Sequence, residues 1–262
     1  MTSIALTIAG SDPSGGAGLQ ADLKTFHQHG VYGAAAVSLI TVQNTRSVSK
    51  VVPLEPELLR SQIRAVIEDL DVGAVKTGAL GSEANIEVVS EEFRDRRVPL
   101  VVDPVMVSTH GALLLDKSGQ RRVRALLPST FLVTPNAPEA ALLTGRSVAS
   151  VADAEDAARA LVQCGVESVL VKGGHLTHDE QACDVLLTQG VIHRFPAKRI
   201  PSRHTHGTGC SLSAAITAWL AHGESLPTAV WRSKRWISSA IESAKPIGTG
   251  IGPINHAEPV VP

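Results

Sequence analysis

The stretch Thr205-His206-Gly207-Thr208-Gly209-Cys210-Ser211-Leu212 is the most informative part of this chain. Two glycines flank a threonine, and an apolar helical face begins directly after them. That face is formed by Leu212, Ala215, Ile216, Trp219 and Leu220. The glycines therefore lie at a helix N-terminus, where unpaired backbone N–H groups and the helix dipole favour an anion. The alternative is a glycine-rich turn that only relieves backbone strain.

The composition is that of a globular protein of ordinary charge. The chain has 262 residues, of which 44% are hydrophobic and 19% are charged, and its net charge is −1. Nothing in this balance favours nucleic acid or an anionic membrane as a partner. Three cysteines without paired spacing fit a reducing compartment. The N-terminus lacks a basic region, and no apolar run approaches the roughly 20 residues of a membrane helix. We expect a cytoplasmic protein.

Apolar strand patterns alternate with helical patterns along the whole chain. The strand patterns cover residues 4–9, 34–42, 72–76, 100–103, 131–134 and 169–172. They are near-continuous apolar runs, as expected when helices cover both faces of a mostly parallel sheet. Residues 185–187 and 191–195 around Thr188-Gln189-Gly190 predict an antiparallel hairpin. The pattern predicts one α/β domain over residues 1–262, with a Gly- and Pro-rich tail after Lys245 packed back as loop.

Polar residues gather where the predicted strands end. In an open α/β sheet, ligands bind beyond the carboxyl ends of the strands, so these residues are candidates as a set. The set comprises Asp12, Gln43, Asn44, Lys76, Asp103, Asn136, Lys172 and the Gly207–Cys210 turn. Convergence of several elements on one sheet edge is stronger evidence than any single motif.

The glycine motifs do not match the familiar nucleotide-binding loops. Residues 16–21 fit G-x-G-x-x-A, but no acidic residue ends the second predicted strand, so a dinucleotide site is not indicated. No G-x-x-x-x-G-K-[ST] occurs, which excludes a P-loop. Lys172 precedes two glycines at a strand end and could contact a β- or γ-phosphate, or could simply precede a surface turn.

Three further residues allow both a structural and a functional interpretation. Asn136 and Glu139 have the spacing of a helix capping box, yet they could also hold Mg²⁺ through water. Asp103 either ends a strand or points a carboxylate at the reacting centre. The His27/His29 and His204/His206 pairs lack further metal-ligand spacing, so a zinc site is not indicated.

Cys210 differs from the other cysteines because it lies in the first turn of a helix. Cys164 and Cys183 fit packing positions. A helix N-terminus would lower the pKa of the Cys210 thiol, whereas a neighbouring triphosphate would raise it. The sequence leaves the sign of the net pKa shift open.

Six blocks in order resemble the hydroxymethylpyrimidine/phosphomethylpyrimidine kinases of thiamine biosynthesis. The blocks are Ala9–Thr25, Val42–Thr45, Val102–Met106, Thr134–Ala140, Val171–His175 and Thr205–Cys210, with Gly250–Pro253 behind them. They span nearly the whole chain. The resemblance implies a ribokinase-like fold, with a central mostly parallel sheet and helices on both faces. It also implies a homodimer that uses ATP and Mg²⁺ to phosphorylate 4-amino-5-hydroxymethyl-2-methylpyrimidine to its monophosphate and then its diphosphate.

The resemblance also implies roles for individual residues. Gly207, Thr208 and Gly209 correspond to the anion hole, and Cys210 stands at the position of the catalytic base. Gln43 is similar to the side chain that pairs with the pyrimidine. The other substrate-side positions are Asp12, Ala17, Thr41, Ala79 and Met106. On the ATP side, Lys172 would contact the triphosphate, and Asn136, Glu139 and Asp103 the water shell of the metal.

Two departures from the family pattern bear on the substrate. Thr109 stands near a position that is often lysine in relatives, which bears on the phosphate contacts of the flap and hence on the second phosphorylation. Ala79 stands where relatives usually carry a bulky residue, which predicts a roomier pocket. A pyridoxal kinase is therefore an alternative, since its substrate is also a hydroxymethylated heteroaromatic ring. A non-catalytic pyrimidine sensor is a further alternative, but such a protein should have lost the phosphate-handling residues that are present here.

Overall fold

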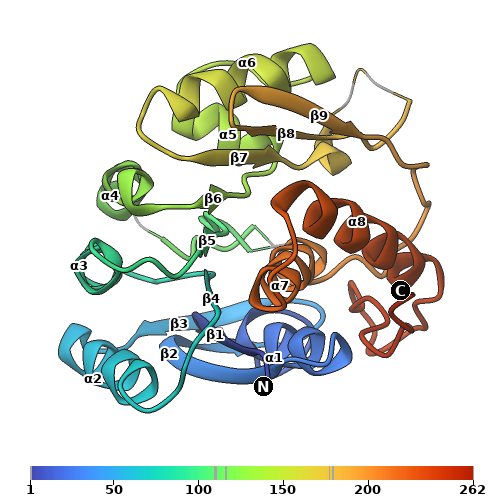
Figure 1. Cartoon of the computed structure of the whole chain (residues 1–262). Coiled ribbons are helices and arrows are strands. Elements are labelled where there is room, and N and C mark those ends of the chain that lie inside the picture. Colours follow the sequence, from blue (N-terminus) through green and yellow to red (C-terminus); the bar gives the residue numbers. More distant parts are fainter. Residues whose placement is uncertain (1, 109–110, 116, 177, 179, 262) are drawn as a thin grey trace.

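The computed structural model describes residues 2–108, 111–115, 117–176, 178 and 180–261, and in these ranges nine strands form one sheet (Figure 1). Thr109 lies outside the described residues. The strand order is β3-β2-β1-β4-β5-β6-β7-β8-β9. The strands are β1 (Ile4–Ser11), β2 (Tyr32–Gln43), β3 (Val48–Pro53), β4 (Ala74–Thr77), β5 (Leu100–Val102), β6 (Leu132–Val133), β7 (Ser168–Val171), β8 (Asp184–Thr188) and β9 (Val191–Phe195).

The centre of the sheet is parallel and its two edges are antiparallel. Strands β2, β1, β4, β5, β6 and β7 pair in parallel, whereas β3, β8 and β9 run antiparallel to their neighbours. This confirms the predicted mostly parallel sheet. The predicted hairpin is also confirmed: β8 and β9 are joined by Gln189 and Gly190, which both have positive φ, as a two-residue hairpin turn requires.

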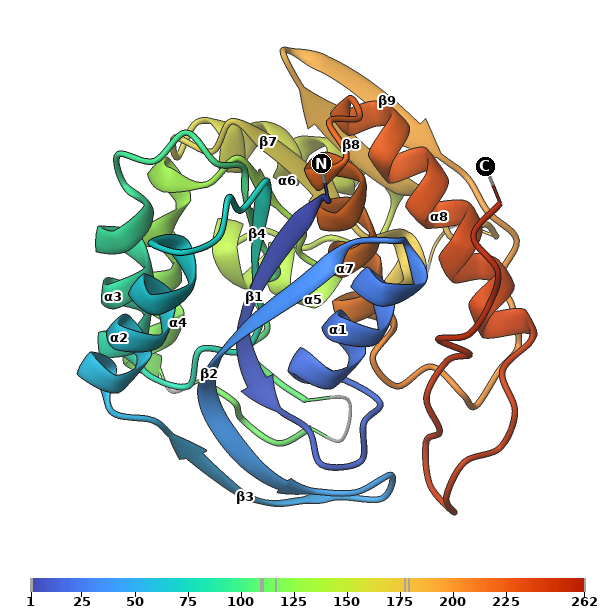
Figure 2. The ribbon, with the colours of Figure 1, turned by 60° about the horizontal axis from the view of Figure 1, so that its bottom comes forward.

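Helices cover both faces of the sheet, as predicted (Figures 1 and 2). One face carries α2 to α6 and the other carries α1, α7 and α8. The helices are α1 (Gly18–Gln28), α2 (Pro56–Ile67), α3 (Glu83–Phe93), α4 (Lys117–Leu126), α5 (Ala137–Thr144), α6 (Val151–Val162), α7 (Thr208–Ala221) and α8 (Leu226–Glu242), with short 3₁₀ turns at Leu127–Ser129 and Gly173–His175.

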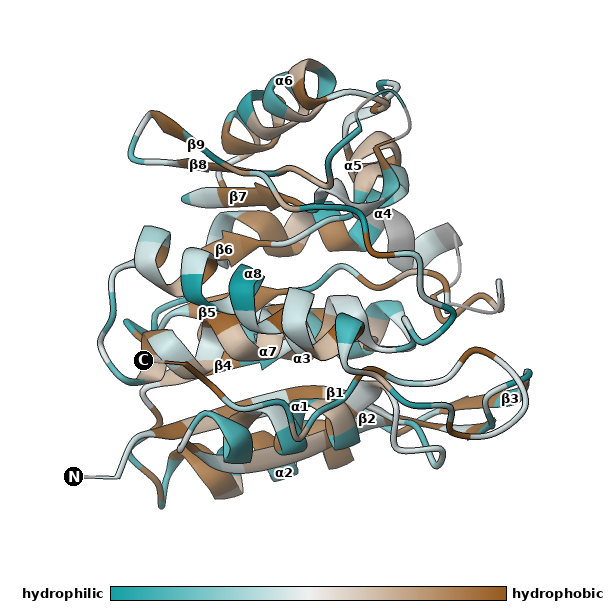
Figure 3. Cartoon of the chain, turned by 90° about the vertical axis from the view of Figure 1, so that its right-hand side faces the viewer, coloured by the Kyte–Doolittle hydropathy of each residue, from teal (hydrophilic) through white to brown (hydrophobic). Residues whose placement is uncertain are grey.

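The core consists of two apolar layers, one on each face of the sheet, and Figure 3 shows the apolar strands enclosed between helices. Within β5, Leu100 and Val102 pack towards the layer under α2 to α6, while Val101 packs towards α7 and α8. Both faces of the strand are buried, so it carries no polar alternation. This explains why the central strands read as continuous apolar runs.

One strand was missed by the sequence analysis. β3 lies at the edge of the sheet, and most of its side chains are partly or fully exposed. Its residues, Val48 to Pro53, mix apolar and polar types, and the terminal proline is tolerated because an edge strand has one unpaired side. An edge strand needs neither a continuous apolar run nor strict alternation, so periodicity gave no signal.

The tail after Lys245 does pack back on the domain, as expected. The backbone N–H of Ile251 donates to the carbonyl of Thr45, and that of His206 donates to the carbonyl of Gly252. The tail therefore links the loop after β2 to the segment before α7. In the described ranges, no helix has both the length and the apolar character needed to cross a membrane.

A fully buried ion pair joins α1 to the middle of the sheet. Lys76 Nζ of β4 lies 2.8 Å from Asp22 Oδ2 of α1, and both side chains are inaccessible to solvent. Thr7 of β1 donates a 2.6 Å hydrogen bond to the same carboxylate oxygen. Lys76 thus does not join the ligand-facing residues at the strand ends, where its position in the sequence had placed it as a candidate. Its charge is instead balanced inside the core.

Replacing Asp22 by alanine should destabilise the fold strongly. The Lys76 ammonium would lose its partner in a site without water, a loss that typically costs about 3–5 kcal/mol of unfolding free energy. Urea denaturation measures this cost. Glu57→Gln, which removes one carboxylate from the exposed Glu57–Arg60 pair, serves as the matched control and should change stability by less than about 1 kcal/mol. Equal, small effects of the two substitutions would contradict the assigned role of the buried pair.

Candidate active site

A cavity of about 780 Å³ opens at the carboxyl ends of the parallel strands. This volume lies within the roughly 300–1,000 Å³ that small-molecule sites occupy. Every residue to which the family resemblance assigned a role lines it: Asp12, Ala17, Thr41, Gln43, Ala79, Asp103, Met106, Asn136, Glu139, Lys172, Gly207, Thr208, Gly209 and Cys210. Of the candidate residues at the strand ends, Asn44 and Lys76 do not line it: Asn44 accepts from the backbone N–H groups of Arg46 and Ser47, and Lys76 pairs with Asp22. The fold therefore brings together residues that are up to 198 positions apart in the chain, from Asp12 to Cys210.

The turn before α7 depends on glycine. Gly207 caps the helix with a φ of +78°, and a side chain there would collide with the carbonyl oxygen of Gly16. The carbonyl of Gly207 accepts from Ser211 N–H, but in the described chain no carbonyl accepts from the N–H groups of Gly209 and Cys210. These two donors are available to an anion at the helix N-terminus.

The Lys172 ammonium faces the cavity close to Gly209 of this turn. Its Nζ is 2.7 Å from Asp103 Oδ1 and 4.0 Å from Glu139 Oε2, and a Cβ on Gly209 would lie 3.2 Å from the ammonium. Burial alone would lower the pKa of Lys172, but the carboxylates of Asp103 and Glu139 outweigh it and raise the pKa. The ammonium is charged at neutral pH and can contact a phosphate oxygen as a point charge.

Asp103 is held firmly from three sides. Besides Lys172, it lies 3.3 Å from Ser213 Oγ, whose hydroxyl is also 3.0 Å from the carbonyls of Gly209 and Cys210, and 3.5 Å from Thr134 Oγ1; it is 1% exposed. Asp103 extends the line of β5, and Ser213 belongs to α7. The carboxylate therefore fixes the end of the strand relative to the helix whose N-terminus faces the cavity.

Asn136 and Glu139 form the capping box that their spacing predicted. Asn136 Oδ1 accepts from Glu139 N–H at 2.9 Å, and Glu139 Oε2 accepts from Asn136 N–H at 2.8 Å. Burial raises the pKa of Glu139 to about 7, although the nearby Lys172 opposes that rise. Lys172 thus balances the negative charge of the Glu139 carboxylate only poorly, and a further cation nearby would stabilise that charge.

The donor set fits Mg²⁺ only through water. Among the described residues, no group of three or more His, Cys, Asp or Glu side chains could hold an ion directly. Mg²⁺ retains several waters and usually needs only one or two carboxylates besides phosphate oxygens. The buried Glu139 carboxylate beside Asn136 meets that requirement.

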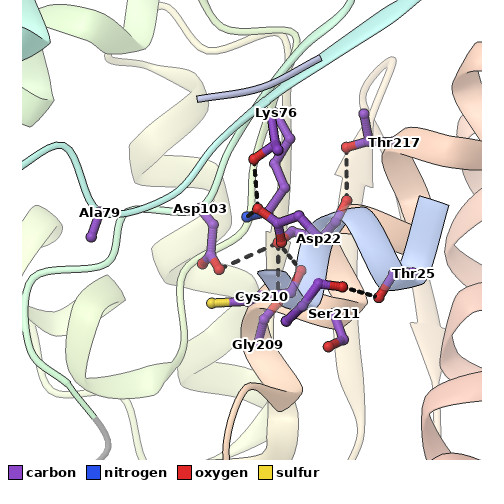
Figure 4. A network of polar contacts seen from close by, with 12 residues as sticks. Asp22, Thr25, Lys76, Ala79, Asp103, Gly209, Cys210, Ser211 and Thr217 are labelled. Atoms are coloured by element: carbon purple, nitrogen blue, oxygen red, sulfur yellow. Dashed lines mark hydrogen bonds and ion pairs between the residues drawn. The ribbon is translucent and has the colours of Figure 1, made fainter. Parts of the chain in front are cut away.

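Cys210 lies near Asp103 and the buried Asp22–Lys76 pair (Figure 4). Asp103 in turn pairs with Lys172. Removal from bulk water raises the pKa of its thiol to about 11; Lys76 opposes that rise, and Asp103 and Asp22 reinforce it. The shift in the pKa of the Cys210 thiol, whose sign the sequence left open, is therefore upward. The lowering expected from the helix N-terminus is outweighed by burial and by two carboxylates, and the thiol is protonated at neutral pH.

The opposite end of the cavity is lined by short polar side chains. Thr41 Oγ1 donates to the carbonyl of Ser11 at 2.9 Å and lies 3.3 Å from Gln43 Oε1. Asp12 Oδ2 accepts from the backbone N–H of Ala17 at 2.9 Å. Ala79 and Met106 also line the cavity, and a roomier pocket at position 79 stays a prediction.

His206 is a site residue that the sequence analysis considered only as a metal ligand. Its Nε2 lies 2.8 Å from Asp12 Oδ2 and 3.3 Å from Gln43 Nε2, and the residue is 1% exposed. The useful signal was its position immediately before Gly207, which makes it the neighbour of the anion-binding turn. Its partners lie on the β1 and β2 strand ends, so spacing to other histidines could not reveal its role.

The glycines of residues 16–21 serve close backbone packing. Gly18 has a φ of +58°, and a side chain there would collide with the carbonyl oxygen of Gly10 at the end of β1. A Cβ on Gly16 would lie 2.5 Å from the His206 ring. This explains the G-x-G-x-x-A pattern without a dinucleotide.

The family follows from comparison with known proteins. The family model for phosphomethylpyrimidine kinase matches residues 12–255. This chain belongs to that family. It is 47% identical over 260 residues to the hydroxymethylpyrimidine/phosphomethylpyrimidine kinase of Rhizobium meliloti, with 98% of this chain and 97% of the relative covered. It is 44% identical over 253 residues to a thiamine biosynthesis bifunctional protein of Geobacter sulfurreducens, of which it spans about half, 51%.

Solved structures of related kinases share the fold. An ADP complex of Bacillus subtilis pyridoxal kinase matches with a TM-score of 0.90 at 34% identity, with 98% of each chain covered. The pyridoxal kinase of Staphylococcus aureus with AMP-PCP and pyridoxal matches with a TM-score of 0.89 at 32% identity, covering 98% and 95% of the two chains. The phosphomethylpyrimidine kinase of Clostridium difficile matches with a TM-score of 0.80 at 40% identity, covering 91% and 99%. The fold is ribokinase-like.

The protonated state of Cys210 can be tested by alkylation with iodoacetamide. A thiol with a pKa of about 11 is mostly protonated below that pH, so its alkylation rate should rise about tenfold per pH unit between pH 7 and 9.5 without a plateau. Peptide mass spectrometry separates Cys210 from Cys164 and Cys183. The unfolded chain in denaturant is the control, in which the rate should level off near an ordinary pKa of about 8.5. A plateau below pH 9 in the folded chain would contradict the account.

Proposed function

We propose that this chain transfers the γ-phosphoryl group of ATP to the hydroxyl of 4-amino-5-hydroxymethyl-2-methylpyrimidine, and then phosphorylates the resulting monophosphate. Family membership supports the class of reaction, and the relatives in that family are named for both steps. A related kinase that holds AMP-PCP in its solved structure supports ATP as the phosphoryl donor.

The observation that carries this proposal is that the short segment from His206 to Cys210, at the start of α7, reaches from one end of the cavity to the other. His206 contacts the Gln43 amide at one end of the cavity, and Gly209 lies beside the Lys172 ammonium at the other. The free N–H groups of Gly209 and Cys210 lie along this short stretch. An anion-binding turn thus separates an amide suited to a heteroaromatic ring from a cation suited to a phosphate chain.

Positioning and charge neutralisation account for most of the proposed mechanism, because phosphoryl transfer requires little covalent chemistry from the protein. Gln43 pairs with the ring and directs the hydroxymethyl group towards the Gly207–Gly209 turn. The backbone N–H groups of the turn and the Lys172 ammonium stabilise negative charge on the transferring group. Glu139 and Asn136 would hold Mg²⁺ through water, and the ion would neutralise phosphate charge when bound.

Two residues can accept the hydroxyl proton. Cys210 can do so only after its thiol has released its own proton to solvent, and Lys76 is the cation that favours the resulting thiolate. Asp103 pairs with Lys172 and could accept the proton if that pair loosens when Lys172 contacts the phosphate chain. We assign the role of proton acceptor to Cys210 because it lies in the anion-binding turn. The Cys210→Ala variant described below distinguishes Cys210 from Asp103.

Pyridoxal is the second candidate substrate. The small Ala79 lines the substrate end of the cavity, and two of the structural neighbours are named pyridoxal kinases. The pyrimidine is favoured because identity is higher to the pyrimidine kinases, 47% against 34%. The homodimer, the cytoplasmic location and the single domain over 1–262 stay predictions.

Mass analysis of the products tests the proposed reaction. Incubation with ATP, Mg²⁺ and the pyrimidine should give the monophosphate first and then the diphosphate. The kcat/KM for the pyrimidine should exceed that for pyridoxal. Cys210→Ala should fold, as judged by its melting temperature, and should lose about 10²–10⁴-fold in kcat, the usual contribution of a positioned proton acceptor.

Each outcome contradicts a separate part of the proposal. A faster reaction with pyridoxal would replace the substrate, and a reaction that stops at the monophosphate would remove the second step. A near wild-type kcat in Cys210→Ala would assign the role of proton acceptor to Asp103 and leave the substrate assignment intact.

A further inference from the structure

The His206 ring is held rigidly between the two polar groups of the substrate site. A Cβ on Gly16 would lie 2.5 Å from the ring, so only glycine leaves room for it. The backbone N–H of His206 donates to the carbonyl of Gly252 at 3.0 Å. The ring Nε2 then lies 2.8 Å from Asp12 Oδ2 and 3.3 Å from the Gln43 amide. One ring nitrogen thus contacts both a carboxylate and an amide.

The Asp12 carboxylate determines that His206 Nε2 carries a hydrogen. Asp12 accepts from the backbone N–H groups of Ser14 and Ala17, each at 2.9 Å. Burial alone would raise the pKa of Asp12, but the hydrogen bonds from His206 and Ser14 outweigh burial and lower it. An ionised carboxylate offers only lone pairs. His206 Nε2 must therefore carry a hydrogen, both in the neutral imidazole and in the imidazolium.

The hydrogen on His206 Nε2 restricts the orientation of the Gln43 amide. A hydrogen on His206 Nε2 can meet the amide oxygen but is repelled by the amide NH₂ group. Rotation of the amide by 180° exchanges Oε1 and Nε2 without changing the shape of the side chain, so hydrogen bonding decides the orientation. Because the ring N–H already donates to Asp12 and Nε2 then has no lone pair, only the orientation with the amide oxygen towards His206 avoids placing two donors against each other.

Thr41 favours the same orientation. Its single hydroxyl hydrogen lies 2.9 Å from the Ser11 carbonyl, and Gln43 Oε1 at 3.3 Å would compete for that hydrogen. With the amide nitrogen towards Thr41 instead, the nitrogen donates to Thr41 Oγ1 while the hydroxyl donates to Ser11. No two donors then face each other, and the Gln43 oxygen shares the His206 hydrogen that Asp12 accepts. Two independent contacts, on opposite sides of the amide, agree.

We propose that His206 is a positioning residue for substrate specificity: held by Asp12, its Nε2–H fixes the Gln43 amide with the oxygen towards His206 and the nitrogen towards Thr41. One lone pair and one N–H of Gln43 remain for the ligand, in a fixed order along the cavity wall. The inference rests on the proposed function, in which Gln43 pairs with the pyrimidine ring.

The fixed order selects one pattern on the ring edge. A 4-aminopyrimidine presents a donor on the amino group next to an acceptor on the ring nitrogen. The 4-oxo analogue presents an acceptor next to an N–H donor, which is the reverse. The ring cannot turn over to compensate, because its 5-hydroxymethyl group must face the Gly207–Gly209 turn. Accepting the oxo ring would require the amide to rotate and to place its NH₂ group against His206.

The test compares kcat/KM for the amino and oxo rings in three proteins. In the wild type the ratio should be about 10⁴, the selectivity of sites built on buried hydrogen bonds. His206→Leu removes the ring N–H and should lower the ratio at least tenfold, mainly by raising kcat/KM for the oxo ring relative to that for the amino ring. His206→Gln offers an NH₂ group to both Asp12 and Gln43 and should retain the ratio within about threefold. An unchanged ratio in His206→Leu would overturn the inference.

A second measurement tests the fixed hydrogen without relying on activity or on a folded leucine variant. In ¹⁵N-histidine-labelled protein, the His206 signals are identified by their loss in His206→Gln, and Nε2 should be protonated. An unprotonated Nε2 would overturn the inference. If the wild type fails to phosphorylate the amino ring, the proposed function fails, while the nitrogen signal still decides whether Asp12 fixes the His206 hydrogen.

Discussion

The close approach of two backbone segments, at Gly207 and Gly16, is the constraint on which this site depends. Any side chain on Gly207 would collide with the Gly16 carbonyl, and its positive φ turns the chain directly into α7. The N-terminus of α7 is thereby held at the carboxyl end of β1. His206 reaches Asp12 on one side of this turn, and Gly209 lies beside Lys172 on the other. A displaced turn would disconnect the two halves of the cavity.

Charge in the site is arranged as buried pairs around this turn. Asp22–Lys76 lies behind Cys210 and Asp103–Lys172 lies beside it, so the thiol faces cations and carboxylates together. Burial and the two carboxylates keep the thiol protonated before nucleotide binds. Contacts between Lys172 and a phosphate chain would change this balance, because they compete with Asp103 for the ammonium. The same residues would then set both the affinity for phosphate and the state of the proton acceptor.

The sequence allowed the parallel sheet and the lining of the cavity to be predicted, but not the partners of several residues. Buried strands read as apolar runs, and in a parallel sheet their carboxyl ends share one edge, which is why Asp103, Lys172 and Gln43 were grouped correctly. The edge strand β3 is largely exposed and carries no apolar signal. Lys76 also ends a strand, but it turns inward because Asp22, on a helix distant in sequence, balances its charge. The roles of Lys76 and His206 depend on such contacts, which periodicity does not encode.

The central claim is that the transferring phosphoryl group lies at the Gly207–Gly209 turn. A crystal structure of the chain with ADP, aluminium fluoride, Mg²⁺ and the pyrimidine locates that group directly. The account predicts the fluoride within hydrogen-bonding distance of the N–H groups of Gly209 and Cys210, with Lys172 Nζ on its other side and the Gln43 amide on the ring. Fluoride bound instead at the Gly15–Gly18 loop, with the α7 N-terminus unoccupied, would contradict it.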